Sequence, residues 1–314
     1  MIDFKGQVVV VTGAGRGLGR AYAREIARRG ASVIVNDLGC ATSGEGSDPS
    51  VADRVVTEIV EEGGVAAPSY DSVATPEGGA AIVEAALSQF GRVDAVISNA
   101  GGLNITAFAN LSPTDWRRTM SIHLDGAFHV SQPAFRAMKR QGYGRIVFIA
   151  SSAGIFGQPS VAPYAAAKAG LVGLANVIAI EGAAHGIKAN TVLPFAATRM
   201  MTELVGEERV AETPYMRAQD PQLVAPVVAY LASRDCAVSQ HIYSAGLGRF
   251  ARVFTGLGEG WGSEPDSEPT VEDIQAHLPD LARTTPFTVP LSIFDEIATI
   301  CAQRGIPYLP HAAA

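Results

Sequence analysis

The sequence predicts an α/β fold in which a parallel, doubly wound sheet of seven strands is covered by helices on both faces. Two observations support this fold class. Short apolar runs alternate with longer segments of helical periodicity, the order expected when each helix connects two parallel strands. The first apolar run, residues 8–12, is a continuous stretch of β-branched residues, which is typical of a strand buried on both faces.

The helices between the strands carry recognisable end signals. After the first strand, apolar residues recur at every fourth position of a helix that ends at Gly30, where helices favour glycine. Ser112, Pro113 and Asp115 provide a cap, a first-turn proline and an early acid for a helix expected to continue to about residue 139. Further helices are predicted at residues 51–62, up to 90, 164–185 and 221–234. The strands of this Rossmann-type sheet are predicted at residues 8–12, 32–37, 65–71, 93–101, 144–152, 187–194 and 241–246.

Residues beyond about 248 break this alternation. The segment GEGWGSEPDSEPT has the composition of a loop, and residues 271–282 and 290–303 are predicted to form short helices. We therefore expect residues 1–248, which carry the alternating strands and helices, to form one domain. Residues 249–314 are expected to form a C-terminal extension packed on that same domain.

Composition and charge exclude several classes of protein. The 314 residues carry a net charge of −7, which argues against a general nucleic-acid binder because such proteins need a basic surface. Cys40, Cys236 and Cys301 are widely spaced and odd in number, which favours a reducing compartment. The N-terminal residues do not resemble a signal peptide and no apolar segment is expected to span a membrane, so we predict a cytoplasmic protein. His123 and His129 lack the four-residue spacing of helical metal ligands, so no metal is expected.

A glycine-rich turn follows the first predicted strand. Its sequence, TGAGRGLG, does not fit the common pattern G-x-G-x-x-G, but Gly13, Gly17 and Gly19 have the spacing of a tight turn. Glycine at these positions lets the pyrophosphate of a dinucleotide approach backbone N–H groups at a helix N-terminus. The turn therefore predicts a dinucleotide site, with an ordinary flexible turn as the alternative.

The residue after the second strand indicates which dinucleotide binds. Asp37 can accept hydrogen bonds from the adenosine ribose and would repel a 2′-phosphate, which favours NAD over NADP. Arg16, in the glycine-rich turn, weakly favours NADP because it could pair with that phosphate. We predict NAD, with a solvated loop acid as the alternative interpretation of Asp37.

The other strand ends carry polar or small residues that suit a dinucleotide. In open α/β sheets, ligands bind beyond the carboxyl ends of the strands. Asp71 could reach the adenine ring or cap the next helix, and residues 99–101 could lie against the adenosine. The residues predicted to bind the cofactor are Gly13, Arg16, Gly17, Leu18, Gly19, Asp37, Asp71, Ser72, Asn99, Ala100, Gly101, Tyr164, Lys168, Pro194 and Thr198.

The segment PYAAAKAG places Tyr164 and Lys168 four residues apart, on one face of a helix. Tyrosine has a pKa of about 10, and a neighbouring ammonium group lowers it. The pair could therefore act as an acid/base group, and simple helix packing is the alternative. Ser151 follows the fifth strand, where a strand end can meet the start of this helix.

Taken together, the segments TGAGRGLG, SNAG, YAAAK and KANTVLP, with Ser151, resemble the short-chain dehydrogenase/reductase family over about residues 5–250. The resemblance implies hydride transfer between a substrate carbon and a nicotinamide cofactor. It implies that Tyr164 exchanges a proton with the substrate oxygen, and that Ser151 hydrogen-bonds this oxygen. Lys168 would hold the nicotinamide ribose and lower the pKa of Tyr164.

Two positions depart from the family pattern. His123, in SIHLDGAF, stands where the family usually has an Asn that anchors a water relay to the lysine. It is predicted to be either a fourth member of the catalytic group or a satisfied core histidine. Phe195, in LPFAAT, replaces the usual Gly. It either narrows the nicotinamide pocket or only packs against neighbouring residues.

The segments VNDLG, YDSV, HLDGAF, YGRIV and GLANVIAIEG further resemble the dehydrogenase domain of peroxisomal multifunctional enzymes of type 2 and their bacterial relatives. This resemblance implies oxidation of a (3R)-3-hydroxyacyl-CoA or a 17β-hydroxysteroid with NAD. Residues 198–210 are expected to form a lid. Met200, Met201, Leu204 and Val205 would give it an apolar underside suited to a lipid-like substrate.

Two other functions stay open. An NADPH-dependent 3-oxoacyl reductase is disfavoured by Asp37, and a non-catalytic dinucleotide-binding module is disfavoured by the intact Ser151, Tyr164 and Lys168. The family resemblance also implies a homodimer or homotetramer, formed through the helices that begin near residues 113 and 164. The small residues 165–170 would let a second subunit's helix approach closely.

Overall fold

A computed structural model of the chain describes residues 2–40, 46–196, 219–264 and 267–308. The chain forms two compact units, Met1–Arg252 and Val253–Ala314, each of which is described by itself. The predicted packing of the C-terminal extension on the catalytic domain stays a prediction.

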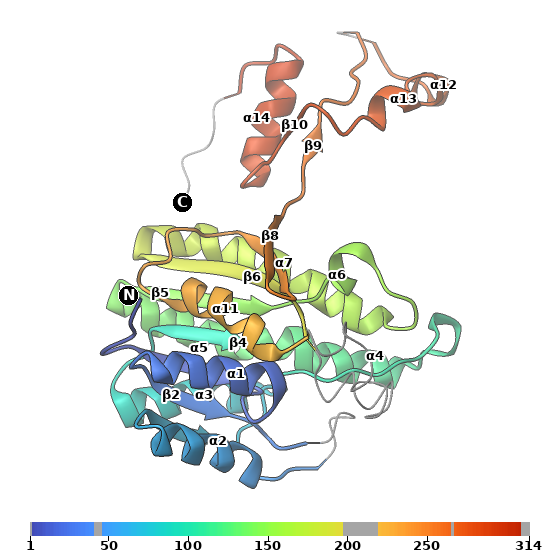
Figure 1. Ribbon diagram of the computed structural model, residues 1–314. Coiled ribbons are helices and arrows are strands. Elements are labelled where there is room, and N and C mark those ends of the chain that lie inside the picture. Colours follow the sequence, from blue (N-terminus) through green and yellow to red (C-terminus); the bar gives the residue numbers. More distant parts are fainter. Residues whose placement is uncertain (1, 41–45, 197–218, 265–266, 309–314) are drawn as a thin grey trace. The chain divides into compact units, whose positions relative to one another are not determined.

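The first unit is built on a sheet with the strand order β3-β2-β1-β4-β5-β6-β7-β8 (Figure 1). All strand pairs from β3 to β7 are parallel, so the predicted doubly wound sheet is confirmed. The order reverses between β1 and β4, which creates the crevice where ligands bind in such sheets. The strands are β1 (Val8–Thr12), β2 (Ser32–Asn36), β3 (Val65–Ser69), β4 (Ala95–Ser98), β5 (Gly144–Ile149), β6 (Ile187–Phe195), β7 (Ile242–Gly246) and β8 (Arg249–Val253).

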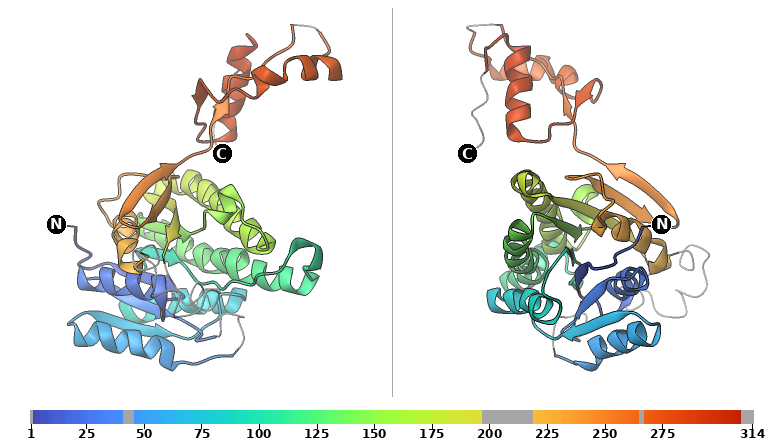
Figure 2. Two further views of the ribbon diagram at one scale, coloured as in Figure 1. Left: turned by 45° about the vertical axis from the view of Figure 1, so that its right-hand side comes forward. Right: turned by 90° about the vertical axis from the view of Figure 1, so that its left-hand side faces the viewer.

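Helices cover both faces of this sheet, as the edge-on view in Figure 2 shows. The helices α1 (Gly17–Arg28), α2 (Ser50–Glu61) and α11 (Ala225–Ala232) contact one another on one face. The helices α3 (Pro76–Phe90), α5 (Gly126–Gln141) and α7 (Ala162–Gly182) do so on the other. Because both faces are covered, every residue of β1 is buried, as its continuous apolar run predicts.

Local signals position the helix ends. Thr75 caps α3 by accepting the Gly78 N–H at 3.1 Å, and Ser112 caps α4 (Pro113–Met120) by accepting the Asp115 N–H at 3.0 Å. Gly91 ends α3 in the left-handed conformation. The shorter elements are α6 (Ala153–Phe156) and the 3₁₀ turns η1 (Phe108–Asn110), η3 (Ala183–His185) and η4 (Pro221–Leu223).

The helix predicted from residue 113 to about 139 is interrupted. A π-helical turn, η2 (Ser121–Asp125), separates α4 from α5 and contains His123. A π-turn carries one extra residue per turn, and such turns are frequent at functional sites. The sequence analysis predicted one continuous helix here and missed this turn.

The structure adds one strand to the seven that were predicted. Leu247 and Gly248, with φ values of 55° and 74°, form a two-residue turn that returns the chain beside β7 as β8. A connection this short joins antiparallel strands. Strand β8 was missed because its sequence, RFARV, has no apolar run and none of its residues is buried.

The second unit contains β9 (Leu257–Gly258), α12 (Val271–Ala276), α13 (Leu278–Leu281), β10 (Phe287–Thr288) and α14 (Ile293–Gln303). The predicted helix at 271–282 is therefore two short helices, whereas the helix predicted at 290–303 is confirmed as α14. Reciprocal capping boxes begin α12, at Thr270 and Asp273, and α14, at Ser292 and Asp295. No described residue from 253 to 308 is buried.

One expectation about apolar length needs correction. Within the described part of the chain, residues 162–185 are long and apolar enough to cross a membrane by length and composition. This stretch is α7 with η3, and it packs against β5 and β6 and carries the buried Lys168. One face of this stretch therefore packs on the sheet, and the other carries the exposed residues Val177 and Ile180.

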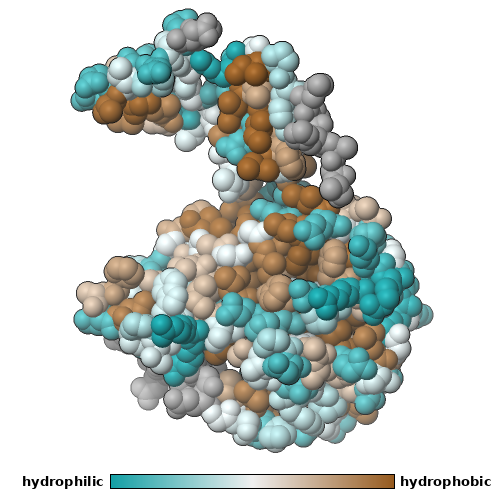
Figure 3. Space-filling view, turned by 180° about the vertical axis from the view of Figure 1, so that it is seen from behind, coloured by the Kyte–Doolittle hydropathy of each residue, from teal (hydrophilic) through white to brown (hydrophobic). Residues whose placement is uncertain are grey.

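The side of the first unit that carries α3, α5 and α7 also exposes apolar residues. Figure 3 shows the molecule from this side, where apolar side chains are interspersed with polar ones. On the helices α4, α5 and α7 the exposed apolar residues are Trp116, Phe128, Val177 and Ile180.

We predict that Tyr22→Phe stabilises the protein. Tyr22 in α1 is fully buried, and its hydroxyl has no hydrogen-bond partner among the described residues. An unpartnered buried hydroxyl costs about 1–3 kcal/mol, so its removal should raise the free energy of unfolding by about 1 kcal/mol. Urea denaturation should show a higher midpoint with an unchanged m-value.

Tyr143→Phe is the matched control, because its hydroxyl accepts a hydrogen bond from Gln7 Nε2 at 3.1 Å. This variant should lose stability. A loss of stability in Tyr22→Phe as well would contradict the prediction.

Candidate active site

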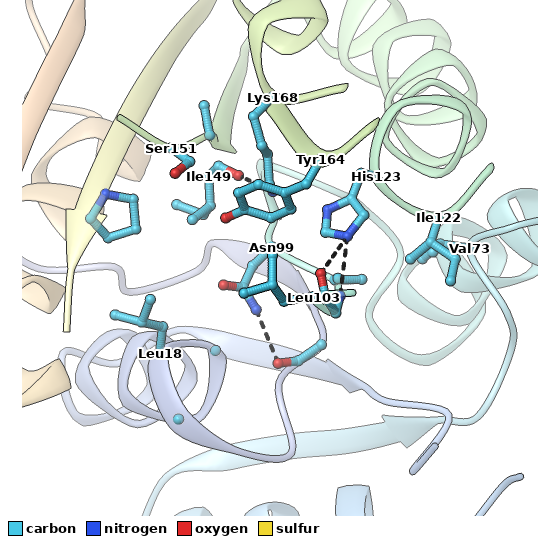
Figure 4. Close-up of a pocket in the computed structure, with 18 of the residues that line it drawn as sticks. Leu18, Val73, Asn99, Leu103, Ile122, His123, Ile149, Ser151, Tyr164 and Lys168 are labelled. Atoms are coloured by element: carbon cyan, nitrogen blue, oxygen red, sulfur yellow. Dashed lines mark hydrogen bonds between the residues drawn. The ribbon is translucent and has the colours of Figure 1, made fainter. Parts of the chain in front are cut away.

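A cavity of about 470 Å³ lies at the carboxyl ends of the strands, around the point where the strand order reverses. Figure 4 shows Tyr164 and Lys168 reaching into it beside His123 and Ser151, with Asn99 and Leu18 nearer the glycine-rich turn. All the predicted site residues that the structure describes line this one cavity. They are Gly13, Arg16, Gly17, Leu18, Gly19, Asp37, Asp71, Ser72, Asn99, Ala100, Gly101, His123, Ser151, Tyr164, Lys168 and Pro194. Thr198 and the predicted lid at 198–210 lie outside the described residues.

The glycine-rich turn has the shape of a cradle. Gly13 and Gly17 have φ values of 62° and 50°, which favour glycine. A Cβ on Gly19 would overlap the carbonyl oxygen of Gly13, and a Cβ on Gly13 would lie 2.8 Å from Ala100 Cα. Gly15, to which the sequence assigned no role, is also closely packed, because a Cβ there would overlap Val51. These close contacts fix the shape of the turn, which lines the cavity at the start of α1.

Asp37 lies beside this turn, at the end of β2. Its carboxylate accepts the Gly15 N–H and the Gly39 N–H, each at 2.8 Å. Arg16 Nη1 donates to the carbonyl oxygen of Cys40 at 3.2 Å. The acid and the turn are therefore tied together at one end of the cavity.

Asn99 and Thr12 join the ends of β4 and β1. Asn99 Nδ2 donates to the carbonyl oxygens of Thr12 and Gly13, both at 3.0 Å. In return, Thr12 Oγ1 accepts the N–H groups of Asn99 and Ala100 at 3.0 and 3.1 Å. The sequence analysis missed Thr12, although a hydroxyl at the end of a buried apolar strand was the available signal.

Asp71 lies at the end of β3 and is not a helix cap, because Thr75 caps α3. Its carboxylate accepts the Ser69 hydroxyl at 3.1 Å, and its carbonyl oxygen accepts Asn36 Nδ2 at 2.9 Å. Asn36 was not predicted as a site residue, yet it orients the end of β3 toward the cavity.

Tyr164, Ser151 and Lys168 meet at the other end of the cavity. The Ser151 side chain hydrogen-bonds to the Tyr164 hydroxyl. Lys168 Nζ donates to the carbonyl oxygen of Ile149 at 2.6 Å and lies 5.6 Å from the centre of the Tyr164 ring. The helical spacing thus brings both side chains of α7 to the end of β5, as predicted.

The pKa values differ from the expectation that Lys168 lowers that of Tyr164. Burial raises the pKa of Tyr164, and the hydrogen bond from Ser151 only partly opposes this rise. Burial also lowers the pKa of Lys168 to about 7, so the ammonium group is only partly charged near neutrality. Desolvation therefore dominates over the charge–charge effect in the ligand-free site.

His123 lies beside Tyr164 and is 4% exposed. Its Nε2 atom is 2.8 Å from the carbonyl oxygen of Gly102, and its ring meets the Tyr164 ring edge-on, with centroids 5.1 Å apart. Burial, and secondarily the charge of Lys168, lower the pKa of His123 to about 3, so the ring is neutral at working pH. Phe195, the second departure from the family pattern, lines the cavity and is 42% exposed.

Several further residues complete the cavity wall. Most are apolar or contribute backbone, so nothing in their chemistry marked them in the sequence. They are Leu38, Val73, Ala74, Gly102, Leu103, Ile122, Gln158 and Gln219.

Residues 7–209 match the short chain dehydrogenase family, so the chain belongs to that family and is an oxidoreductase. Among individual proteins, it is 44% identical over 275 residues to a short-chain type dehydrogenase/reductase of Mycobacterium tuberculosis, covering 88% of this chain and 93% of that protein. It is 46% identical over 252 residues to peroxisomal multifunctional enzyme type 2 of Mus musculus, covering 80% of this chain and 33% of that enzyme. The predicted resemblance to this family and subgroup is confirmed.

Solved structures give the same relationship. The full-length peroxisomal multifunctional enzyme type 2 of Drosophila melanogaster has a TM-score of 0.79 and 32% identity, over 96% of this chain and 50% of that one. A 7α-hydroxysteroid dehydrogenase complexed with NADH and 7-oxo glycochenodeoxycholic acid has a TM-score of 0.70 and 28% identity, over 78% and 95%. The chain spans about a third of the mouse enzyme and half of the Drosophila enzyme.

The family binds a nicotinamide dinucleotide, and the residues of the cavity fit such a ligand. The glycine cradle lies at the N-terminus of α1, where a pyrophosphate would be favoured, and Asp37 offers carboxylate oxygens where a ribose would lie. At the opposite end, Tyr164, Ser151 and Lys168 supply a hydroxyl pair and an amine for proton exchange.

Gly19→Ala should weaken binding of the dinucleotide. The added methyl group would overlap the Gly13 carbonyl oxygen and push the turn out of shape. We expect the Kd for NADH, measured by fluorescence titration, to rise at least about tenfold, or 1.4 kcal/mol. Gly173→Ala in α7 is the control, since a Cβ there meets no atom within 4 Å. Equal affinities in both variants would contradict this view of the turn.

Lys168→Met should remove a pH dependence of stability. The pKa of Lys168 is about 7 in the folded protein and about 10.4 in the unfolded chain, so between these values the unfolded chain binds more protons. Wild-type stability should therefore rise with pH in this window, by up to about 1.4 kcal/mol per pH unit from this group.

The test is urea denaturation of both proteins at pH 7 and pH 9.5. The difference in free energy of unfolding between wild type and Lys168→Met should change with pH in favour of the wild type. A pH-independent difference would show that Lys168 is not forced toward its neutral form.

Proposed function

We propose that this chain is an NAD-dependent dehydrogenase that oxidises the hydroxyl group of a 3-hydroxyacyl-CoA thioester, with a 17β-hydroxysteroid as the second candidate substrate. The observation that carries the proposal is the single cavity with Tyr164, Ser151 and Lys168 at one end and the glycine cradle with Asp37 at the other. A dinucleotide extended between the two ends would bring its nicotinamide to the tyrosine.

In the proposed reaction, the residues of the chain accept the proton of the substrate hydroxyl, and the hydride would go to the cofactor. NAD, when bound along the cavity, would supply the acceptor for the hydride of the carbinol carbon. Tyr164 Oη takes the proton from the substrate hydroxyl. Ser151 Oγ, already hydrogen-bonded to that phenol, donates to the substrate oxygen and stabilises its developing charge. Lys168, held by the Ile149 carbonyl oxygen, stabilises the phenolate whenever its amine is protonated.

NAD is proposed over NADP on electrostatic grounds. Asp37 is fixed at the cradle by the N–H groups of Gly15 and Gly39, and its negative charge would repel a 2′-phosphate. Arg16, the cation that could attract this phosphate, donates to the Cys40 carbonyl oxygen. The related 7α-hydroxysteroid dehydrogenase was solved with NADH, which supports the same choice.

The substrate proposal rests on similarity and on the apolar wall of the cavity. The peroxisomal multifunctional enzyme type 2 of Mus musculus and the hydratase-dehydrogenase-epimerase of Saccharomyces cerevisiae each align over 80% of this chain, at 46% and 42% identity. Val73, Leu103 and Ile122 give the cavity an apolar wall, which suits an acyl chain. Steroid rings would find the same surface.

The proposal includes a homo-oligomer in the cytoplasm. Trp116 on α4, Phe128 on α5, and Val177 and Ile180 on α7 are exposed apolar residues on the helices that the family resemblance assigns to a four-helix contact between subunits. A reducing compartment is consistent with Cys40, Cys236 and Cys301, none of which is part of a disulfide.

The test is NADH formation by the purified protein. We expect turnover with NAD and a 3-hydroxyacyl-CoA series, at a kcat/KM higher than with 17β-hydroxysteroids and with NADP. Tyr164→Phe should reduce kcat by at least about a hundredfold, because the proton acceptor is lost, while the Kd for NADH stays unchanged.

Other results would change the proposal in defined ways. Preference for NADPH and a 3-oxoacyl substrate would favour the biosynthetic reductase. Tight NADH binding without turnover on any substrate would favour a non-catalytic module. Full activity of Tyr164→Phe would refute the mechanism.

A further inference from the structure

We propose that His123 is a positioning residue whose Nε2 atom ties the backbone after β4 to the helix α5 side of the cavity and so holds Tyr164 for proton transfer. This inference rests on the proposed function and deepens it. It assigns to the histidine a role that differs from the water relay implied for an Asn at this position.

The first contact is with Gly102. His123 Nε2 lies 2.8 Å from the Gly102 carbonyl oxygen and 3.1 Å from its nitrogen. The Gly102 N–H donates to Nε2 in one tautomer, and Nε2 donates to the Gly102 carbonyl oxygen in the other. We assign the proton to Nε2, because the contact with the carbonyl oxygen is the shorter of the two. Gly101 has no side chain to keep the ring away, and a Cβ there would overlap the imidazole. The ring is therefore locked against the segment that follows β4.

The second contact is with Tyr164. The two rings meet at 83° with centroids 5.1 Å apart, the edge-to-face arrangement that aromatic pairs prefer. Figure 4 shows the imidazole standing beside the tyrosine on the side away from Ser151. The phenol is thus held between the serine hydroxyl and the imidazole ring, with Lys168 above it in this view.

The π-helical turn explains how one side chain makes both contacts. His123 is the middle residue of η2 (Ser121–Asp125), between α4 and α5. The extra residue in a π-turn changes the direction of the side chains relative to a regular helix. The turn therefore aims a buried polar side chain into the cavity where a regular helix would present a different face.

His123 does not act as an acid or base in this arrangement. Its ring is neutral, and its Nδ1 atom has no hydrogen-bond partner among the described residues. The groups of the cavity that face it, Tyr164 and Lys168, bring no negative charge that would favour an imidazolium. The tie to Gly102 through Nε2 is the polar contact that remains, and it needs only a neutral donor.

Two substitutions distinguish the role of Nε2 from that of Nδ1 in His123. The amide of Gln reaches the place of Nε2, whereas the shorter Asn amide reaches the place of Nδ1. We expect His123→Gln to keep kcat within about threefold of the wild type. His123→Asn should lose about a hundredfold in kcat, the scale expected when a reacting group is misplaced by about 1 Å. The KM for NAD should be unchanged in both.

The opposite result, an active Asn variant and an inactive Gln variant, would overturn the proposal and favour a relay through Nδ1. Equal activities, high or low, would overturn it as well, because Nε2 would then not be what matters. The kcat–pH profiles of wild type and His123→Gln should coincide on the acid side. A limb present only in the wild type would show that His123 titrates during turnover and would overturn the proposal.

His129→Asn is the matched control on the same helix. Its Nδ1 atom bonds the Val73 carbonyl oxygen at 3.0 Å, which Asn can reproduce, and it does not line the cavity. Its kcat should equal that of the wild type.

A measurement without substrate distinguishes this inference from the proposed function. In ¹⁵N-labelled protein, the resonances of His123, assigned by their loss in His123→Gln, should report the Nε2–H tautomer from pH 5 to pH 8. Protonation within this range, or the Nδ1–H tautomer, would overturn the inference. If the wild type oxidises none of the substrates, the proposed function fails while this measurement still tests His123.

Discussion

The exchange of hydrogen bonds between Thr12 and Asn99 is the interaction on which the site depends. It joins the ends of β1 and β4, the two strands between which the strand order reverses. The Asn99 amide also donates a hydrogen bond to the Gly13 carbonyl oxygen, and this bond helps to hold the shape of the glycine cradle. A parallel doubly wound sheet has a crevice where its strand order reverses. The hydrogen bonds between Thr12 and Asn99 fix the position of the backbone at the bottom of this crevice.

The titratable side chains at the catalytic end of the cavity are held in place where they have lost most of their hydration. Lys168, His123 and Tyr164 are all buried, and burial is the largest influence on the pKa of each. The charged forms of all three are therefore disfavoured before a ligand arrives. Each side chain has a contact that fixes it in place, to Ile149, Gly102 and Ser151 respectively. A bound dinucleotide thus meets groups whose geometry is already set.

The two ends of the cavity differ in their electrostatic environment. The cradle end carries the Asp37 carboxylate, which is fixed by two backbone N–H groups. At the tyrosine end, burial disfavours the charged forms of Tyr164, Lys168 and His123. The same cavity therefore has a carboxylate at one end and buried titratable groups at the other.

The sequence by itself determined the architecture and the membership of the site. Continuous β-branched runs can only be satisfied by strands covered on both faces, and the carboxyl ends of parallel strands must share one edge. Tyr164, Lys168, Ser151, Asp37 and the glycines could therefore be assigned to one cavity from their places along the chain. Such inferences depend on periodicity and local spacing, which can be read directly from the order of the residues.

Only the tertiary structure decided the features that arise between segments distant in sequence. The role of Thr12, the lowered pKa of His123 and the raised pKa of Tyr164 depend on the water that burial removes and on which backbone groups come close. The π-turn interrupts a segment predicted as one helix, and β8 pairs with β7 despite its polar sequence. Desolvation and long-range contact have no local signature, which is why the sequence could name the reacting groups but not their protonation.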